Sequence, residues 1–208
     1  LFYKNRGGHM RRILSWVLII AGVLLILSPF IKNGYSIYTQ RQLLESLERS
    51  YSPNFEEAEK NVAVLPTPDP APAVQPKVPV KAVLILSIPR LNLKTAVVGG
   101  VTPRDLSVGP GLYPDSARPG ETGNVAIAGH RNVFGSWFRH LNQLAPGDRI
   151  SITYQGNVYE YSVEEVFIVA ENDWSVVAST NYKALTLTTC DPPGNVTQRL
   201  IVRARQIN

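Results

Sequence analysis

The chain has 208 residues, of which 44% are hydrophobic and 18% are charged, and its formal net charge at neutral pH is +5. Most of the excess charge lies in residues 1–81, because residues 82–208 hold eleven Lys or Arg against ten Asp or Glu. A nearly neutral C-terminal part excludes a basic nucleic-acid-binding face, and the sequence contains no glycine-rich phosphate loop or paired metal-ligand motif. The composition therefore predicts no nucleic-acid partner, no cofactor and no metal.

Residues 13–31 (ILSWVLIIAGVLLILSPFI) form an apolar run without a charged side chain. As a helix this run would be ~28 Å long, close to the hydrocarbon thickness of a bilayer. A cleaved signal peptide and a buried helix are the alternatives, but the run exceeds a typical signal core and no small-residue cleavage site follows it. We therefore predict a retained single-pass anchor in the cell membrane, with the lipid bilayer as its partner.

Basic residues next to this run set its predicted orientation. Arg11 and Arg12 precede it directly, so the positive-inside rule places the N-terminus in the cytoplasm and the rest of the chain outside the cell. Residues 10–32 are assigned to a cytoplasmic tip and the anchor. Residues 1–9 precede Met10 and could be a non-native remnant, so no function is inferred from them.

Residues 33–81 are predicted to separate the anchor from a folded domain. Leu43, Leu44 and Leu47 lie at helical spacing, which indicates a juxtamembrane helix that could pack on the membrane, on the domain or on a second copy. Residues 66–79 hold six prolines in fourteen residues and would span ~40 Å in polyproline geometry. We interpret them as a stalk; the alternative, a ligand for a proline-binding domain, fits an extracellular segment poorly.

Residues 82–208 suffice for one domain with a single core. Apolar and alternating runs bounded by turn residues predict strands at residues 83–88, 95–98, 124–130, 149–154, 157–169, 184–190 and 199–207. Gln155 and Gly156 supply a tight hairpin turn. The pattern predicts an all-β fold, a closed β-barrel with short helices or turns between strands, preceded by one N-terminal transmembrane helix.

The single cysteine, Cys190, ends the predicted strand at residues 184–190. A lone cysteine is more often a small buried hydrophobe than a catalyst, and it excludes an intramolecular disulfide. Strand alternation points Leu185 and Leu187 to the core and places Cys190 on the opposite face with two threonines. The thiol is therefore a candidate nucleophile.

Arg199 begins the next predicted strand and can stand beside Cys190. A neighbouring cation favours the thiolate, which an unperturbed thiol with a pKa near ~8.5 would populate only slightly at neutral pH. Arg203 lies on the same strand face but ~13 Å further along, so we assign it to the surface or to the periphery of the substrate. Leu200 and Val202 are expected to point into the core.

A cysteine nucleophile needs a proton donor for its leaving group, and histidine is the usual choice. His130 closes the apolar run at residues 124–130, at the end of a strand where a side chain reaches a barrel rim. His140 lies in a short helical pattern at residues 136–144, where an exposed or capping role fits better, and His9 precedes the membrane segment. We select His130.

At these residues the chain resembles the sortase family, the membrane-anchored cysteine transpeptidases of Gram-positive bacteria. The family's LxTC motif is matched by residues 187–190, its catalytic histidine by His130 within AGHR, and its catalytic arginine by Arg199. The resemblance covers residues 83–208. It implies the sortase β-barrel for residues 82–208, with Cys190, His130 and Arg199 as catalytic residues.

The resemblance also implies a reaction. Cys190 would attack the threonine carbonyl of an LPxTG-like sorting signal on a secreted surface protein, and an amine of a peptidoglycan precursor would resolve the thioacyl enzyme. Hydrolysis is the variant in which water wins over the amine. The TLTTC form is compatible with sortase classes D and E.

Two alternative functions and two details remain open at this point. A peptidoglycan L,D-transpeptidase would need an S-x-G-C context, which is absent, and a stalked β-domain could instead bind wall polymer or peptide without catalysis. Some sortases bind calcium, but residues 131–147 contain no Asp or Glu, and Glu171 and Asp173 alone make a weak site, so calcium independence is predicted. Residues 67–73 lack the aromatic residue of a lid, so no lid is expected.

Overall fold

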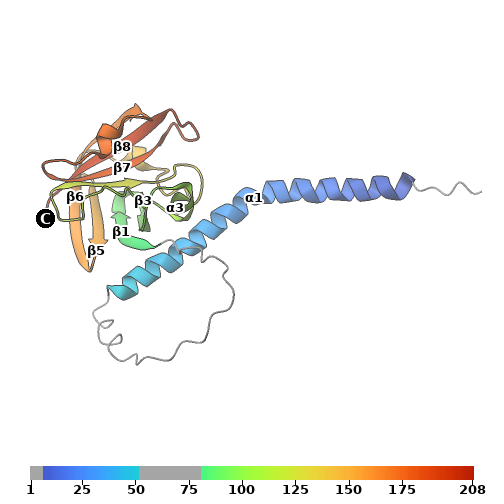
Figure 1. The fold of residues 1–208 in the computed structure, drawn as a ribbon, viewed down its shortest axis with the longest axis horizontal. Coiled ribbons are helices and arrows are strands. Elements are labelled where there is room, and N and C mark those ends of the chain that lie inside the picture. The colour runs from blue at the N-terminus through green and yellow to red at the C-terminus, as the bar shows by residue number, and fades with distance from the viewer. Residues whose placement is uncertain (1–6, 52–80) are drawn as a thin grey trace, which may run out of the picture.

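The computed structural model describes residues 7–51 and 81–208; the predicted stalk and residues 67–73, where no lid is expected, lie outside them. A 44-residue helix, α1 (Gly7–Ser50), leads to a β-domain and projects far beyond it (Figure 1). The predicted juxtamembrane helix is therefore continuous with the apolar run rather than a separate element. Within the described residues α1 alone is long and apolar enough to cross a membrane, and its apolar window is 0% buried.

Eight strands close into a barrel in the order β1-β2-β3-β4-β7-β8-β6-β5, which confirms the predicted all-β barrel. The strands are β1 (Ala82–Ile88), β2 (Leu93–Gly99), β3 (Gly111–Leu112), β4 (Gly123–Ala128), β5 (Arg149–Tyr154), β6 (Asn157–Ala170), β7 (Lys183–Asp191) and β8 (Gln198–Gln206). Pairing is antiparallel except for β2 with β3 and β4 with β7. Closure leaves few unpaired strand edges.

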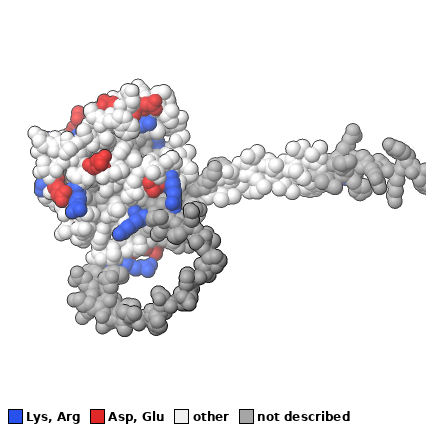
Figure 2. Space-filling model, viewed as in Figure 1, with Lys and Arg blue, Asp and Glu red and all other residues white. Residues whose placement is uncertain are grey.

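Short helices connect the strands at the barrel ends. They are η1 (Pro89–Leu91), α3 (Pro103–Val108), η2 (Leu141–Gln143) and η3 (Trp174–Val177). The predicted helical pattern at residues 136–144 forms turns followed only by the three residues of η2. On the visible face of the barrel, acidic and basic side chains are interspersed without a large patch of either sign, in keeping with its near-neutral charge (Figure 2).

The core fills the barrel, and the predicted inward residues are in it: Leu185 and Leu187 are fully buried. The opposite face of β7 is covered as well. The Thr186 hydroxyl donates to Asn124 Oδ1 at 2.7 Å, and the Asn124 side-chain amide donates to the Val176 carbonyl of η3 at 3.1 Å. Strand β7 is thus buried on both faces until its last residues, which emerge at the end of the barrel.

The C-terminal half of α1 packs against the barrel near β1 and β2 (Figure 1). The juxtamembrane part of the helix was predicted to pack on the membrane, on the domain or on a second copy, and in the structure it packs on the domain. Leu43, Leu44 and Leu47 are half-buried there, whereas Ser36 and Gln40 are fully buried. Polar side chains, rather than the leucine stripe, make the most buried contacts.

Candidate active site

Strand register brings the three predicted catalytic residues to one end of the barrel. In the parallel pair of β4 and β7, Ala128 lies opposite Thr188, and the Gly129 amide donates to the Thr188 carbonyl at 3.0 Å. His130 and Cys190 each follow this pair by two residues, so both emerge at the same edge. In the antiparallel pair of β7 and β8, Cys190 lies directly opposite Arg199.

Cys190 is a free, half-buried cysteine near the end of β7. Its neighbour Thr189 is buried, as the alternation predicts, and donates its hydroxyl to the Gly129 carbonyl at 2.7 Å. On the other face, the hydroxyls of Thr188 and Tyr113 lie 3.2 Å apart. These contacts fix the end of β7 against β4, so the thiol projects from a rigid strand.

His130 is half-buried directly after β4, with its ring centroid 5.3 Å from that of Phe134 and the two planes tilted by 38°. Burial lowers the pKa of His130 below its ordinary value of 6.5, because the charged imidazolium loses solvation. The neutral imidazole is therefore the resting form at neutral pH. It can accept a proton before it donates one.

Arg199 is held by the connection that precedes its strand. Its Nη1 donates to the carbonyls of Val196 at 2.7 Å and Gln198 at 3.0 Å, and its Nη2 lies 3.9 Å from Glu171 Oε2. None of these described hydrogen bonds goes to Cys190. The guanidinium stands at the same rim as the thiol, and because both of these hydrogen bonds come from Nη1, the other N–H groups of the fork can donate to a substrate oxygen.

This rim also holds an ion pair that the sequence analysis did not predict. Arg131 Nη1 pairs with Asp191 Oδ1 and also donates to the Cys190 carbonyl at 3.2 Å. The two side chains are 6% and 18% exposed. The pair joins the residue after His130 to the residue after Cys190. The sequence did contain a signal for this pair: a basic residue directly follows His130, and an acidic residue directly follows Cys190.

The prediction that Arg203 lies at the surface or substrate periphery is wrong. Arg203 is buried and its Nη2 donates to the Val176 carbonyl at 2.9 Å, because η3 covers this part of the strand face. His140 is exposed, as predicted, with Nδ1 3.3 Å from Gln143 Nε2. His9 falls in α1, but its side chain lies outside the described residues.

The two carboxylates considered for calcium are already engaged. Glu171 faces Arg199, and Asp173 Oδ1 accepts from the Ser175 amide at 3.1 Å and from its hydroxyl at 2.5 Å. Among residues 7–51 and 81–208, no group of three or more His, Cys, Asp or Glu is placed to hold a metal ion.

We expect calcium to leave the activity unchanged. With one carboxylate facing a guanidinium and the other capping η3, the site offers too few free oxygens for a hard cation. The measurement is the initial rate of peptide cleavage with and without millimolar calcium, after treatment with a chelator. A severalfold increase on adding calcium would contradict the prediction.

A closed barrel that gathers a free thiol, an imidazole and a guanidinium at one end defines the class of thiol-dependent acyl-transfer enzymes. The family model described as the sortase domain matches residues 86–207, and the chain belongs to the sortase family. Sortases are membrane-anchored cysteine transpeptidases. The resemblance stated from the motifs alone is thereby confirmed.

Relatives fall in several sortase classes. The chain is 32% identical to sortase D of Bacillus subtilis over 127 residues, which cover 59% of this chain and 63%, less than two thirds, of that protein. It matches the structure of a Clostridium perfringens sortase D5 transpeptidase with a TM-score of 0.65 and 26% identity, covering 82% of this chain and 99% of that one. Sortase E1 from Streptomyces coelicolor, solved with a tripeptide in the active site, matches with a TM-score of 0.57 and 27% identity, over 61% of this chain and 88% of that one.

Proposed function

We propose that this chain cleaves an LPxTG-like sorting signal after its threonine, through a thioacyl enzyme on Cys190, and transfers the protein to an amine of a cell-wall precursor. The observation that carries the proposal is the register, in which Cys190 lies opposite Arg199 and His130 follows the end of β4 by two residues, beside the end of β7. The tripeptide in the Streptomyces coelicolor relative supports a peptide substrate. The class D and class E relatives favour one of these classes for this chain.

The proposed chemistry begins with the imidazole of His130 neutral, so that it can accept the proton of the Cys190 thiol. Cys190 Sγ attacks the threonine carbonyl carbon as its proton passes to His130, so that a C–S bond forms and an oxyanion develops. The intermediate then breaks its C–N bond, and His130 returns the proton to the departing amine. The result is a thioester with the active-site imidazole neutral again.

The second half-reaction regenerates the thiol. The incoming amine attacks the thioester carbon and loses a proton to His130; the C–S bond breaks, and the sulfur recovers that proton. Arg199 donates hydrogen bonds to the oxyanion or to substrate carbonyls in both halves, and it stays charged throughout. Water in place of the amine gives hydrolysis as a side activity.

The membrane location is part of the proposal. Residues 10–32 anchor the chain in a single pass, with the N-terminus in the cytoplasm, and residues 33–81 lead to the extracellular catalytic domain at residues 82–208. The exposed apolar surface of α1 supports a lipid environment. This arrangement presents the site to proteins as they leave the membrane.

The full chain in detergent, incubated with LPxTG-like and LAxTG-like peptides with and without an added amine, tests the function. A peptide-sized mass increase on Cys190, or an amine-tagged product, is the expected result. No adduct, no cleavage and a thiol inert to alkylating reagents would instead indicate a non-catalytic domain that binds wall polymer or peptide.

Arg199→Ala is expected to lower kcat/KM at least ~100-fold, in line with the loss of an oxyanion donor. Arg199→Lys keeps the charge but loses the planar fork of donors, so only partial recovery is expected. Arg149→Ala, which removes an exposed arginine from β5, is the control and leaves the rate unchanged. Near-normal turnover of Arg199→Ala would remove Arg199 from the mechanism.

The pH dependence of kcat/KM is expected to report His130. The imidazole must be neutral to accept the thiol proton, so activity falls as the pH drops through its pKa. Because burial lowers that pKa, the acidic limb should lie below pH 6.5. His130→Ala should cost at least ~100-fold and remove the limb. A limb above pH 6.5 would contradict the assignment.

A further inference from the structure

The loop that follows His130, residues 131–140, has an unusual backbone. Three consecutive residues, Phe134, Gly135 and Ser136, have positive φ values of 49°, 84° and 50°. For residues with a Cβ this left-handed region is sparsely populated and persists where surrounding contacts fix it. We call residues 131–140 the histidine loop.

Two side chains of α1 supply such contacts to a single peptide group. The Ser36 hydroxyl donates to the Phe134 carbonyl at 3.1 Å, and Asn33 Oδ1 accepts from the Gly135 amide at 2.6 Å. That carbonyl and that amide belong to the same peptide unit. Asn33 and Ser36 lie three residues apart and so share one face of α1. The helix thereby holds both polar groups of the Phe134–Gly135 peptide.

Gln40 continues the same face one turn later and fastens α1 to the barrel. Its side-chain oxygen accepts from the Ala96 amide at 3.1 Å and from the Thr95 hydroxyl at 2.9 Å, and its nitrogen donates to the Ala96 carbonyl at 3.0 Å. The amide group therefore pairs with β2 as a neighbouring strand would, beside the short strand β3. This contact requires a glycine at position 109, because a Cβ on Gly109 would lie 1.6 Å from Gln40 Nε2.

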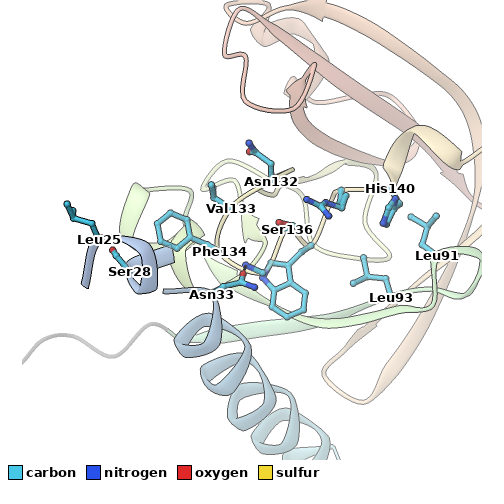
Figure 3. Close-up of a pocket in the computed structure, with 13 residues that line it drawn as sticks. Leu25, Ser28, Asn33, Leu91, Leu93, Asn132, Val133, Phe134, Ser136 and His140 are labelled. Atoms are coloured by element: carbon cyan, nitrogen blue, oxygen red, sulfur yellow. Dashed lines mark hydrogen bonds between the residues drawn. The ribbon is translucent and has the colours of Figure 1, made fainter. Parts of the chain in front are cut away.

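The Phe134–Gly135 peptide belongs in part to Phe134, whose ring packs against that of His130. The Phe134 ring lies 5.3 Å from the His130 ring, and Figure 3 shows Phe134 between the loop and α1, with Asn33 at the foot of the loop. We propose that Asn33 and Ser36 are positioning residues of the active site, which hold Phe134 against His130 through the Phe134–Gly135 peptide. The part of α1 that follows the membrane segment thus helps to position the active site of the catalytic domain. This inference rests on the proposed function.

The test compares substitutions of Asn33 and Ser36 in the full chain in detergent. Asn33→Ala and the double variant Asn33→Ala with Ser36→Ala remove the hydrogen bonds without adding charge, while Asn33→Asp keeps the accepting oxygen. Thr39→Ala is the control, since among the described residues the Thr39 hydroxyl is hydrogen-bonded within α1, to the Tyr35 carbonyl at 2.9 Å. Amide hydrogen exchange of the histidine loop and the pH profile of kcat/KM are measured for each.

The double variant should exchange the loop amides at least ~10-fold faster and lower kcat about 10-fold with little change in KM, as expected for two lost hydrogen bonds. The acidic limb of its pH profile should move up towards pH 6.5, because water that reaches His130 solvates the imidazolium and reverses the lowering of its pKa by burial. A fold defect alone would lower the active fraction without moving the limb. The other charged or titratable groups that the described contacts bring to this end of the barrel are unchanged in the double variant; they are Tyr113, Arg131, Glu171, Cys190, Asp191 and Arg199.

Asn33→Asp should restore slow exchange and most of kcat, and Thr39→Ala should match the parent in every measurement. Should the double variant fail to fold, Asn33→Ala alone gives the same comparison, since Asn33 is exposed. Unchanged exchange and an unchanged limb would overturn the inference. If the parent cleaves no peptide, the proposed function fails, and loop exchange with the pH dependence of Cys190 alkylation still decides the positioning role.

Discussion

Replacing Cys190 with alanine is expected to abolish the covalent peptide adduct and every amine-tagged product. The chain has a single sulfur nucleophile, and the neighbouring hydroxyls are committed elsewhere. Thr189 donates to the Gly129 carbonyl, and Thr188 faces the Tyr113 hydroxyl. Neither can take over the attack without breaking a buried contact. Intact mass spectrometry of the chain after incubation with peptide is the direct measurement.

The control must separate lost chemistry from lost fold. Cys190 is half-buried, so its replacement by alanine removes one partly exposed atom and should leave the unfolding midpoint nearly unchanged. Cys190→Ser, which keeps a polar atom at this position, should also be inactive, because an alkoxide is far harder to form than a thiolate. An adduct on Cys190→Ala would place the nucleophile on another residue.

The barrel could be predicted because each of its long strands carries its own signal. A strand that buries side chains in a barrel must place apolar residues at every second position, as Leu185 and Leu187 do in β7. Strand β3 was not predicted because its two residues are too few to show the alternation of apolar and polar side chains that marks a strand. Helix α3 was missed although Thr102 and Asp105 form a capping box, which is a recognised start signal.

The docking of α1 could not be foreseen from the chain alone. The leucine stripe was the visible pattern, but the buried contacts of the helix are made by Ser36 and Gln40. Polar side chains such as these become informative only once their partners are known. Those partners are backbone groups of Ala96 and Phe134, 56 and 98 residues further along the chain.

The candidate site was predictable in its motif residues and not in their supports. His130, Cys190 and Arg199 follow from strand ends and from the family motif. Arg203 was misplaced because nothing in its own strand shows that η3 folds over it. The Arg131–Asp191 pair was missed because its members lie 60 residues apart and meet only through the parallel pairing of β4 and β7.

That pair carries the second large prediction. Asp191→Asn is expected to lower the free energy of unfolding by about 3 kcal/mol, because it leaves the 6%-exposed guanidinium of Arg131 without its counter-ion. For a chain of this size this corresponds to a fall in Tm of roughly 6–12 °C. Thermal unfolding of the full chain, followed by circular dichroism, measures it.

Two further variants show whether the effect belongs to the pair. Arg131→Met should also destabilise, though less, since Asp191 is more exposed, and adding it to Asp191→Asn should recover part of the loss because a neutral pair has no unmatched charge. Glu160→Gln is the matched control: its ion pair with Arg149 is solvent-exposed, and the expected change is within about 0.5 kcal/mol. If Asp191→Asn is no more damaging than Glu160→Gln, or if the two losses at the pair simply add, the ion pair does not hold the ends of β4 and β7 together.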